Sequence, residues 1–298
     1  MTARTPCVSV CLPVYNGETY INDAIRSIGA QTYADIEVII SDNASTDGTQ
    51  ALCREAGTHD SRIRYVRSDT NRGLAWNYNR AFALATGRYL VWLAHDDLLE
   101  PDYLRQCVEG LQQDADTLLC FTNANYIDDA GHVRQRMDLT NPGAAATPSE
   151  RLHHILYDHR CDPIYGLMKV AYLKQTRLHA GYADSDRVLL AEMGLRGRFH
   201  KLPDYLFSRR LHALQTTACK DRWERTLIFD PSKAGKAVCP WWREFFDFVL
   251  AIRRTPLCRQ ERWRAYKRLY WWSLTHRPFL YHDLRRGLKC ATERLLRR

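Results

Sequence analysis

Short apolar stretches alternate with segments of helical spacing through the first 122 residues, and this alternation constrains the fold more than any other feature of the sequence. Helical spacing is visible, for example, in residues 73–85 and 101–113. The apolar stretches, each long enough for one strand, are residues 8–14, 36–41, 63–68, 88–94 and 118–122. Strands alternating with helices are typical of a sheet with helices on its faces. The sequence therefore predicts an α/β fold with a mainly parallel sheet.

Polar side chains follow three of these stretches at the point where each strand should end. They are Tyr15 and Asn16, Asp42 and Asn43, and His95, Asp96 and Asp97. In open parallel sheets, ligands bind beyond the carboxyl ends of the strands. We therefore expect these side chains to meet at one ligand site.

The adjacent carboxylates of Asp96 and Asp97 repel each other unless a positive charge lies beside them. Hard oxygen ligands suit Mg²⁺ or Mn²⁺, and Mg²⁺ is typically held by one or two carboxylates together with substrate phosphates. The alternative is structural, since Asp97 is placed to cap a following turn. The residues alone leave both interpretations open.

Asp42 and Tyr15 also admit two interpretations each. The carboxylate of Asp42 is suited to accept hydrogen bonds from a base or ribose, but it also stands where a strand-ending turn is expected, with residues 45–47 capping the next helix. Tyr15 either flanks a base ring or packs on the sheet edge. We favour a ligand role for Asp42 and a capping role for residues 45–47.

Several function classes are disfavoured by what the sequence lacks. It contains neither GxxxxGK[ST] nor GxGxxG after the first strand, which disfavours P-loop NTPases and dinucleotide oxidoreductases. Its ten cysteines form no CxxC pair and no zinc-type spacing with histidine. No secretory signal and no run of 18 apolar residues is visible, so we expect a cytoplasmic protein with reduced thiols.

Charge divides the chain into two parts. Residues 221–298 contain 19 Lys and Arg against 8 Asp and Glu, which gives +11, whereas residues 1–220 carry 24 against 26, which gives −2. Six of the eight tryptophans also lie in the basic part, at positions 223, 241, 242, 263, 271 and 272. We expect residues 221–298 to form a separate, helical C-terminal region.

A basic and aromatic region has several interpretations. Trp and Tyr favour a membrane interface and Lys and Arg favour anionic lipid, so docking on the inner face of the cytoplasmic membrane is one. A helical subdomain packed on the rest of the chain is another, and a homodimer interface is a third. Nucleic-acid binding is disfavoured because no recognised motif supports it.

Three linked motifs carry a resemblance to a known family. They are "SVCLPVYNGETYINDAIRSI", "IEVIISDNASTDGT" and "NRGLAWNYNRAFALATGRYLVWLAHDD". Over roughly residues 7–105 the chain resembles a family 2 glycosyltransferase of the GT-A fold, a Rossmann-like nucleotide-diphospho-sugar transferase. The resemblance implies inverting transfer of a sugar from a nucleotide diphosphate donor. It further implies a catalytic domain over residues 1–220, with a nucleotide-sugar-binding half (1–122) and an acceptor-side half (123–220).

The resemblance assigns donor-site residues. Pro13, Tyr15 and Asp42 match positions that hold the nucleobase, with Asn16 beside them, and Arg72, Gly73 and Asn79 match the donor-side segment. Asp96 matches the last Asp of the family's DxD motif, which carries the metal and diphosphate. Ala94 stands where the first Asp is expected, so the metal assignment depends on Asp96 and Asp97, with His95 nearby.

A catalytic carboxylate is implied further along the chain. In "YADSDRVLLAEMGLRGRF", Asp186 matches the second acidic position and Ser185 replaces the first. Asp186 would take the proton from the acceptor hydroxyl. Asp184 is the alternative base, and both carboxylates could merely cap the helix that follows. In "RRLHALQTT", His212 matches a histidine that reaches the metal or diphosphate, helped by Arg209 or Arg210.

The leading hypothesis is a glycosyltransferase that depends on Mn²⁺ or Mg²⁺. Its donor would be a nucleotide sugar, with UDP as the family's commonest nucleotide. Its acceptor would be a glycan or lipid-linked glycan of a cell-surface polysaccharide. A nucleotidyltransferase and a non-catalytic nucleotide-sugar or nucleic-acid binding protein are the alternatives.

Overall fold

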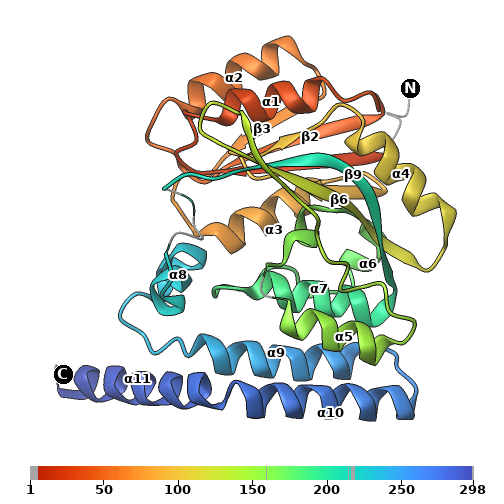
Figure 1. The fold of residues 1–298 in the computed structure, drawn as a ribbon. Coiled ribbons are helices and arrows are strands. Elements are labelled where there is room, and N and C mark those ends of the chain that lie inside the picture. The colour runs from red at the N-terminus through yellow and green to blue at the C-terminus, as the bar shows by residue number, and fades with distance from the viewer. Residues whose placement is uncertain (1–5, 159, 214, 216–218, 297–298) are drawn as a thin grey trace.

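The computed structural model describes residues 6–158, 160–213, 215 and 219–296. Figure 1 shows the elements in layers. Helices α1 (Ile21–Gly29) and α2 (Thr49–His59) lie above a single sheet, and α3 (Leu74–Leu84), α5 (Pro148–Tyr157) and α7 (Ser185–Arg196) lie below it. The C-terminal helices form the lowest layers.

The first four long strands are parallel, as expected. They are β1 (Val8–Val14), β2 (Ile36–Asp42), β3 (Ile63–Arg67) and β4 (Tyr89–Trp92), and they lie in the order β3-β2-β1-β4. All seven residues of β1 and all four of β4 are buried, because helices cover both faces of the sheet. The βαβ alternation thus builds the predicted parallel half.

The second half of the sheet is mixed. β8 (Leu167–Lys169) is antiparallel to β4 and to β6 (Thr117–Ile127), whereas β6 and β9 (Arg198–Arg210) are parallel. The edges carry β5 (Leu98–Leu99), which pairs with β9, and β7 (Val133–Met137), which forms a hairpin with β6. Since residue 122 lies inside β6, the two halves expected of the catalytic domain share one continuous sheet.

Short helices and turns link the second half. They are α4 (Tyr103–Gln113), the 3₁₀ helix η1 (Asp162–Tyr165) and α6 (Val170–Leu173). The start of α5 is fixed by a capping box, in which the Thr147 side chain accepts from the backbone N–H of Glu150 and the Glu150 carboxylate accepts from that of Thr147.

The C-terminal region is helical, as the fold prediction states. It consists of α8 (Arg222–Phe229), the 3₁₀ helix η3 (Pro231–Lys233), α9 (Pro240–Arg254), α10 (Arg259–Thr275) and α11 (Arg277–Leu296). Phe248 of α9 and Trp272 of α10 are fully buried and belong to the same hydrophobic core as the sheet. This region therefore packs as an integral layer, and a domain boundary at residue 220 stays a prediction.

Within the described part of the chain, no helix is long and apolar enough to cross a membrane. All ten cysteines are free thiols.

Candidate active site

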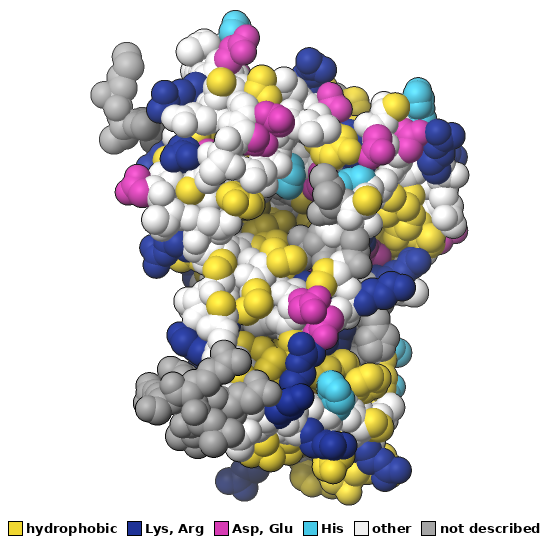
Figure 2. All heavy atoms as spheres, turned by 90° about the vertical axis from the view of Figure 1, so that its left-hand side faces the viewer, with side chains coloured by type: hydrophobic (Ala, Val, Ile, Leu, Met, Phe, Trp, Pro, Cys, Tyr) yellow, Lys and Arg dark blue, Asp and Glu magenta, His cyan; other side chains and the backbone are white. Residues whose placement is uncertain are grey.

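A cavity of about 820 Å³ lies between the carboxyl ends of β1 and β4 and the helices beneath the sheet. Figure 2 looks onto the side where α8 lies, and the surface there is hollowed between the upper and lower layers. Of the residues expected at a ligand site, the cavity is lined by Pro13, Tyr15, Asn16, Asn43, His95, Asp96, Asp97, Asp184, Asp186, Arg209, Arg210 and His212. Four others, Asp42, Arg72, Gly73 and Asn79, are outside the lining.

The loop after β1 is tied to the loop after β2. The backbone N–H of Asn16 donates to the Ser45 hydroxyl at 2.9 Å, and the Asn16 side chain accepts from the N–H of Thr46 at 2.8 Å. Asn16 has a positive φ of 50°, which asparagine tolerates better than most residues. A Cβ at Gly17 would lie 2.6 Å from the His95 ring, so glycine fits best where the loop after β1 meets the loop after β4.

Asp42 is enclosed by protein groups. Its side chain is 0% exposed and accepts hydrogen bonds from the Tyr65 hydroxyl at 2.6 Å and the Ser45 N–H at 2.8 Å. The Arg67 guanidinium lies 3.3 Å from the same carboxylate. The neighbouring Asn43 lines the cavity instead. Contact between Asp42 and a base therefore stays a prediction.

The three donor-segment residues have structural partners. The Arg72 guanidinium lies 4.4 Å from the centre of the Trp76 ring, and Asn79 bonds through its side chain to the backbone of His179. Gly73 is the N-cap residue just before α3 and has a φ of 90°, and a Cβ there would overlap the carbonyl oxygen of Phe229 at the end of α8. This close approach brings α8 to the cavity.

Asp96 and His212 come together from distant parts of the chain. Oδ2 of Asp96 lies 2.8 Å from Nε2 of His212, and both side chains are largely buried. The other ring nitrogen of His212 is buried without a described partner. A carboxylate oxygen and an imidazole nitrogen are both ligands for Mn²⁺, whereas Mg²⁺ takes the oxygen more readily. No cluster of three metal-ligating side chains occurs among residues 6–296 as described, so this pair needs ligand oxygens to complete a metal shell.

Asp97 is oriented by β9. Its Oδ1 accepts the backbone N–H of Arg210 at 2.9 Å, and its side chain is buried. Burial, followed by the charge of Asp96, raises the pKa of this carboxyl. The Arg210 guanidinium donates to the carbonyl oxygen of Asp96 at 3.0 Å and lies over the Tyr20 ring. This geometry joins the ends of β4 and β9, and metal binding by Asp97 stays a prediction.

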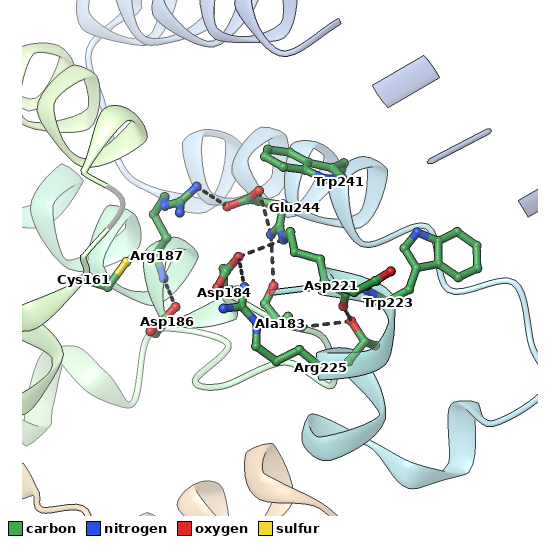
Figure 3. A network of polar contacts seen from close by, with 12 residues as sticks. Cys161, Ala183, Asp184, Asp186, Arg187, Asp221, Trp223, Arg225, Trp241 and Glu244 are labelled. Carbon is green, nitrogen blue, oxygen red and sulfur yellow. Dashed lines mark hydrogen bonds and ion pairs between the residues drawn. The ribbon is translucent and has the colours of Figure 1, made fainter. Parts of the chain in front are cut away.

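The two candidate bases, Asp184 and Asp186, differ in their partners (Figure 3). Asp184 has a positive φ of 67° and forms ion pairs with Arg225, at 2.6 Å, and Arg222, at 2.8 Å. Asp186 accepts only the N–H of Arg187, at 2.9 Å, and forms no ion pair among the described residues. The neighbouring guanidinium of Arg187 instead pairs with the buried Glu244 at 3.1 Å. Asp186 therefore keeps acceptor capacity that Asp184 lacks.

Burial raises the pKa of the Asp186 carboxyl to about 6, and the negative charge of Asp184 adds to this shift. A carboxylate with this pKa is ionised at neutral pH and binds a proton more readily than an exposed aspartate. Perturbed carboxylates of this kind are characteristic of catalytic acids and bases.

Among the contributions to the cavity that were not predicted, two matter most for its chemistry. The first is α8, which brings Arg225 and the apolar residues Leu227 and Ile228 to the lining. The second is His179, which is buried and has no described hydrogen-bond partner at either ring nitrogen, so that burial lowers its pKa to about 3. The only sequence signal for α8 was the pair of arginines one helical turn apart, and His179 gave none.

Comparisons with known proteins identify the family of this chain. The sequence model of the family described as "Glycosyl transferase family 2" matches residues 9–167. Chondroitin synthase of Escherichia coli is 35% identical over 130 residues, which cover 44% of this chain and 19% of that protein. The match thus spans less than a fifth of that relative.

Solved structures share the fold over nearly the whole chain. TarS residues 1–349 of S. aureus in complex with UDP has a TM-score of 0.59 and 16% identity, covering 95% of this chain and 88% of that one. The mannosyltransferase PcManGT of Pyrobaculum calidifontis, in complex with GDP-Man and Mn²⁺, has a TM-score of 0.54 and 19% identity, covering 97% and 81%. These likenesses extend the shared fold through the C-terminal helices.

Proposed function

Because this chain belongs to glycosyl transferase family 2, we propose that it transfers a sugar from a nucleoside diphosphate sugar to an acceptor hydroxyl, with inversion at the anomeric carbon. The observation that carries the proposal is the unpaired carboxylate of Asp186, with a pKa of about 6, in the same cavity as Asp96 and His212. A base and a candidate diphosphate site in one cavity are what direct transfer requires.

Asp186 acts as the general base in this proposal. It accepts the proton of the acceptor hydroxyl while the hydroxyl oxygen forms a bond to the anomeric carbon. The bond from that carbon to the diphosphate oxygen breaks, and its electron pair leaves with the nucleoside diphosphate. Attack from the face opposite the leaving group inverts the configuration in a single displacement.

Asp96 and His212 would hold Mn²⁺ or Mg²⁺, with donor diphosphate oxygens completing the shell. When bound, the ion neutralises the negative charge that develops on the leaving diphosphate. The presence of Mn²⁺ with GDP-Man in the PcManGT complex supports this assignment. Asp97, next to Asp96, accepts the backbone N–H of Arg210, which lies two residues before His212. This hydrogen bond holds together the two chain segments that carry Asp96 and His212.

The nucleotide is proposed to bind at the end of β1. Pro13, Tyr15 and Asn43 line this part of the cavity, and Tyr15 is 42% exposed there. A half-exposed aromatic ring is available to stack on a base. We propose UDP as the nucleotide, which the UDP complex of TarS supports through a shared fold.

The acceptor is proposed to enter past α8. Leu227 and Ile228 line the cavity and are 38% and 43% exposed, so the entrance is partly apolar. An apolar entrance fits an acceptor with a hydrophobic part, such as a lipid-linked glycan of a cell-surface polysaccharide.

A donor screen tests the proposal. Ligands that bind the folded state raise the melting temperature by mass action, so each nucleotide sugar is measured with and without Mn²⁺. The stabilising donors are then incubated with the enzyme, and the released products are identified. Slow release of nucleoside diphosphate is expected. Release of sugar 1-phosphate would indicate that the nucleotidyl group is transferred instead, as in a nucleotidyltransferase. Binding without release of any product, with every acceptor tried, would indicate a non-catalytic binding protein.

A further inference from the structure

Helices α10 and α11 expose a continuous aromatic and apolar stripe on their outer side. The outer stripe consists of Trp263, Tyr266, Tyr270, Leu274, Tyr281, Leu284 and Leu288, all of them exposed. Trp263 and Tyr281 are each 64% exposed, and Leu288 is 67% exposed. Within each helix, neighbours in the stripe are three or four residues apart, which places them on one face of that helix. Apolar groups of this size rarely stay open to water without a function.

The opposite face of the two helices is already used by the fold. Ala265, Leu269 and Trp272 of α10 and Leu280 of α11 are buried against the rest of the protein. In Figure 1 the two helices run along the bottom of the molecule, farthest from the sheet. The outer stripe therefore belongs to a layer with protein on one side only.

Cations accompany the outer stripe. Arg259, Lys267, Arg277, Arg285 and Lys289 are exposed on the same two helices, and none has an acidic partner among the described residues. Figure 2 shows Lys and Arg side chains among hydrophobic ones at this lower end of the molecule. Of the acidic side chains described on these helices, Glu261 accepts the N–H of Ser149 and Asp283 is fully buried. The exposed charge beside the stripe is thus of one sign.

The positive charge beside the outer stripe indicates which kind of partner binds there. A symmetric dimer would place the same surface against itself, so that cations would face cations. Spanning a bilayer is not available to these helices, since none in the described chain is apolar enough. An anionic surface that accepts aromatic rings satisfies both features, and the interface of a bilayer with anionic headgroups is such a surface.

We propose that the outer stripe docks on an anionic membrane, with α10 and α11 lying in the plane of the interface. The aromatic and leucine side chains enter the boundary between headgroups and acyl chains, and the five cations contact lipid phosphates. This inference does not depend on the proposed transferase activity, because it rests only on the outer surface of the C-terminal helices.

Vesicle co-sedimentation of the full chain tests the proposal. We expect binding to vesicles of phosphatidylcholine mixed with phosphatidylglycerol, and little binding to phosphatidylcholine alone. The Debye screening length falls from about 10 Å at 0.1 M salt to about 3 Å at 1 M, so high salt should release most of the protein. A salt-resistant fraction should remain through the aromatic side chains. Equal binding to both kinds of vesicle, or to neither, would overturn the proposal.

A matched pair of variants locates the surface. In the stripe variant, Lys267, Arg277, Arg285 and Lys289 are changed to Gln; in the control, Arg54, Arg64, Arg136 and Lys174, exposed elsewhere, are changed to Gln. Both lose four positive charges. Each cation near an anionic surface contributes about a fivefold factor, and four such factors multiply to several hundredfold, so the stripe variant should lose at least about a hundredfold in vesicle affinity. The control should lose much less; equal losses would show that only net charge matters.

A third variant separates lipid binding from self-association. Trp263→Ser and Tyr281→Ser together shorten the stripe at exposed positions, where folding should be little affected, as circular dichroism can confirm. We expect this variant to lose the salt-resistant fraction of vesicle binding, while light scattering shows the wild type and the variant to have the same mass. A wild-type dimer that the variant dissociates would assign the stripe to a second copy of the chain instead.

Discussion

Asp184 and Arg225 form a two-oxygen ion pair, in which one guanidinium nitrogen of Arg225 lies 2.6 and 2.7 Å from the two carboxylate oxygens of Asp184. This pair joins the start of α7 to α8, a helix outside the segment that matches the family. It neutralises the carboxylate that lies two residues before Asp186. The C-terminal region thus helps to determine which of the two aspartates keeps a free carboxylate.

The first prediction concerns the base. Asp186→Asn should leave donor affinity nearly intact, because the change is isosteric and Asn can still accept the N–H of Arg187, but it should lower transfer about 10²–10⁴-fold. In the wild type, the rate should fall as the pH drops below about 6, where the carboxylate takes up a proton. Steady-state kinetics and calorimetry measure the two effects, and near-normal turnover in this variant would remove Asp186 from the role.

Asp184→Asn provides a control with a different signature. Its loss leaves Arg222 and Arg225 without one charged partner, so we expect it to destabilise the fold by about 1–3 kcal/mol. Because the charge of Asp184 helps to raise the pKa of Asp186, the acidic limb of the rate profile should move to lower pH. An unchanged limb with abolished transfer would instead make Asp184 the base.

The second prediction concerns the stability of the Asp186→Asn variant. The pKa of Asp186 is raised from 3.8 to about 6 on folding, so its ionised form destabilises the folded state above pH 6 by about 3 kcal/mol. The folded state holds the proton more tightly, and this contribution is present below pH 4 and lost as the pH rises through 6. Asp186→Asn should therefore stabilise the protein at pH 8 but hardly at pH 4, as denaturant unfolding can measure.

The parallel half of the sheet could be predicted from the sequence because each of its strands is a short apolar stretch that can be recognised by itself. Sequence reasoning also brought Asp96, Asp186 and His212 to one cavity, through motifs that each occupy a short stretch. It predicted helices from residue 221 onward but not that α8 lines the cavity, since Arg225 meets Asp184 across 41 residues and such a pairing leaves no local pattern. The enclosure of Asp42 by Tyr65 and Arg67 could not be predicted either, because the sequence pattern of an aspartate at a strand end is the same whether its side chain contacts a ligand or other protein groups.

The third prediction concerns the metal pair. Asp96→Ala should abolish Mn²⁺-dependent donor binding while the protein stays folded, since the only side-chain partner described for this carboxylate is His212. His212→Ala should weaken the same binding at least about tenfold, because one of the two proposed protein ligands would be lost. His59→Ala, at an exposed position on α2, serves as the control. Calorimetry that found unchanged metal-dependent affinity in both variants would exclude this pair as the metal site.

The last prediction tests how tightly the C-terminal region is joined to the sheet. Gly73→Ala places a Cβ against the carbonyl oxygen of Phe229 and forces alanine to a φ of 90°. Gly131 also has a positive φ, of 86°, but a Cβ there meets nothing within 4 Å, so Gly131→Ala measures the cost of a positive φ without an overlap, about 1–2 kcal/mol. Gly73→Ala should lose about 1–3 kcal/mol beyond that, because the ψ of 165° at Gly73 suits glycine alone and because the overlap displaces α8. Denaturant unfolding compares the two, and donor titration should show weaker binding in Gly73→Ala only. Equal losses of stability in the two variants would mean that α8 can shift away from Gly73 without cost, and that its side chains do not maintain the shape of the cavity.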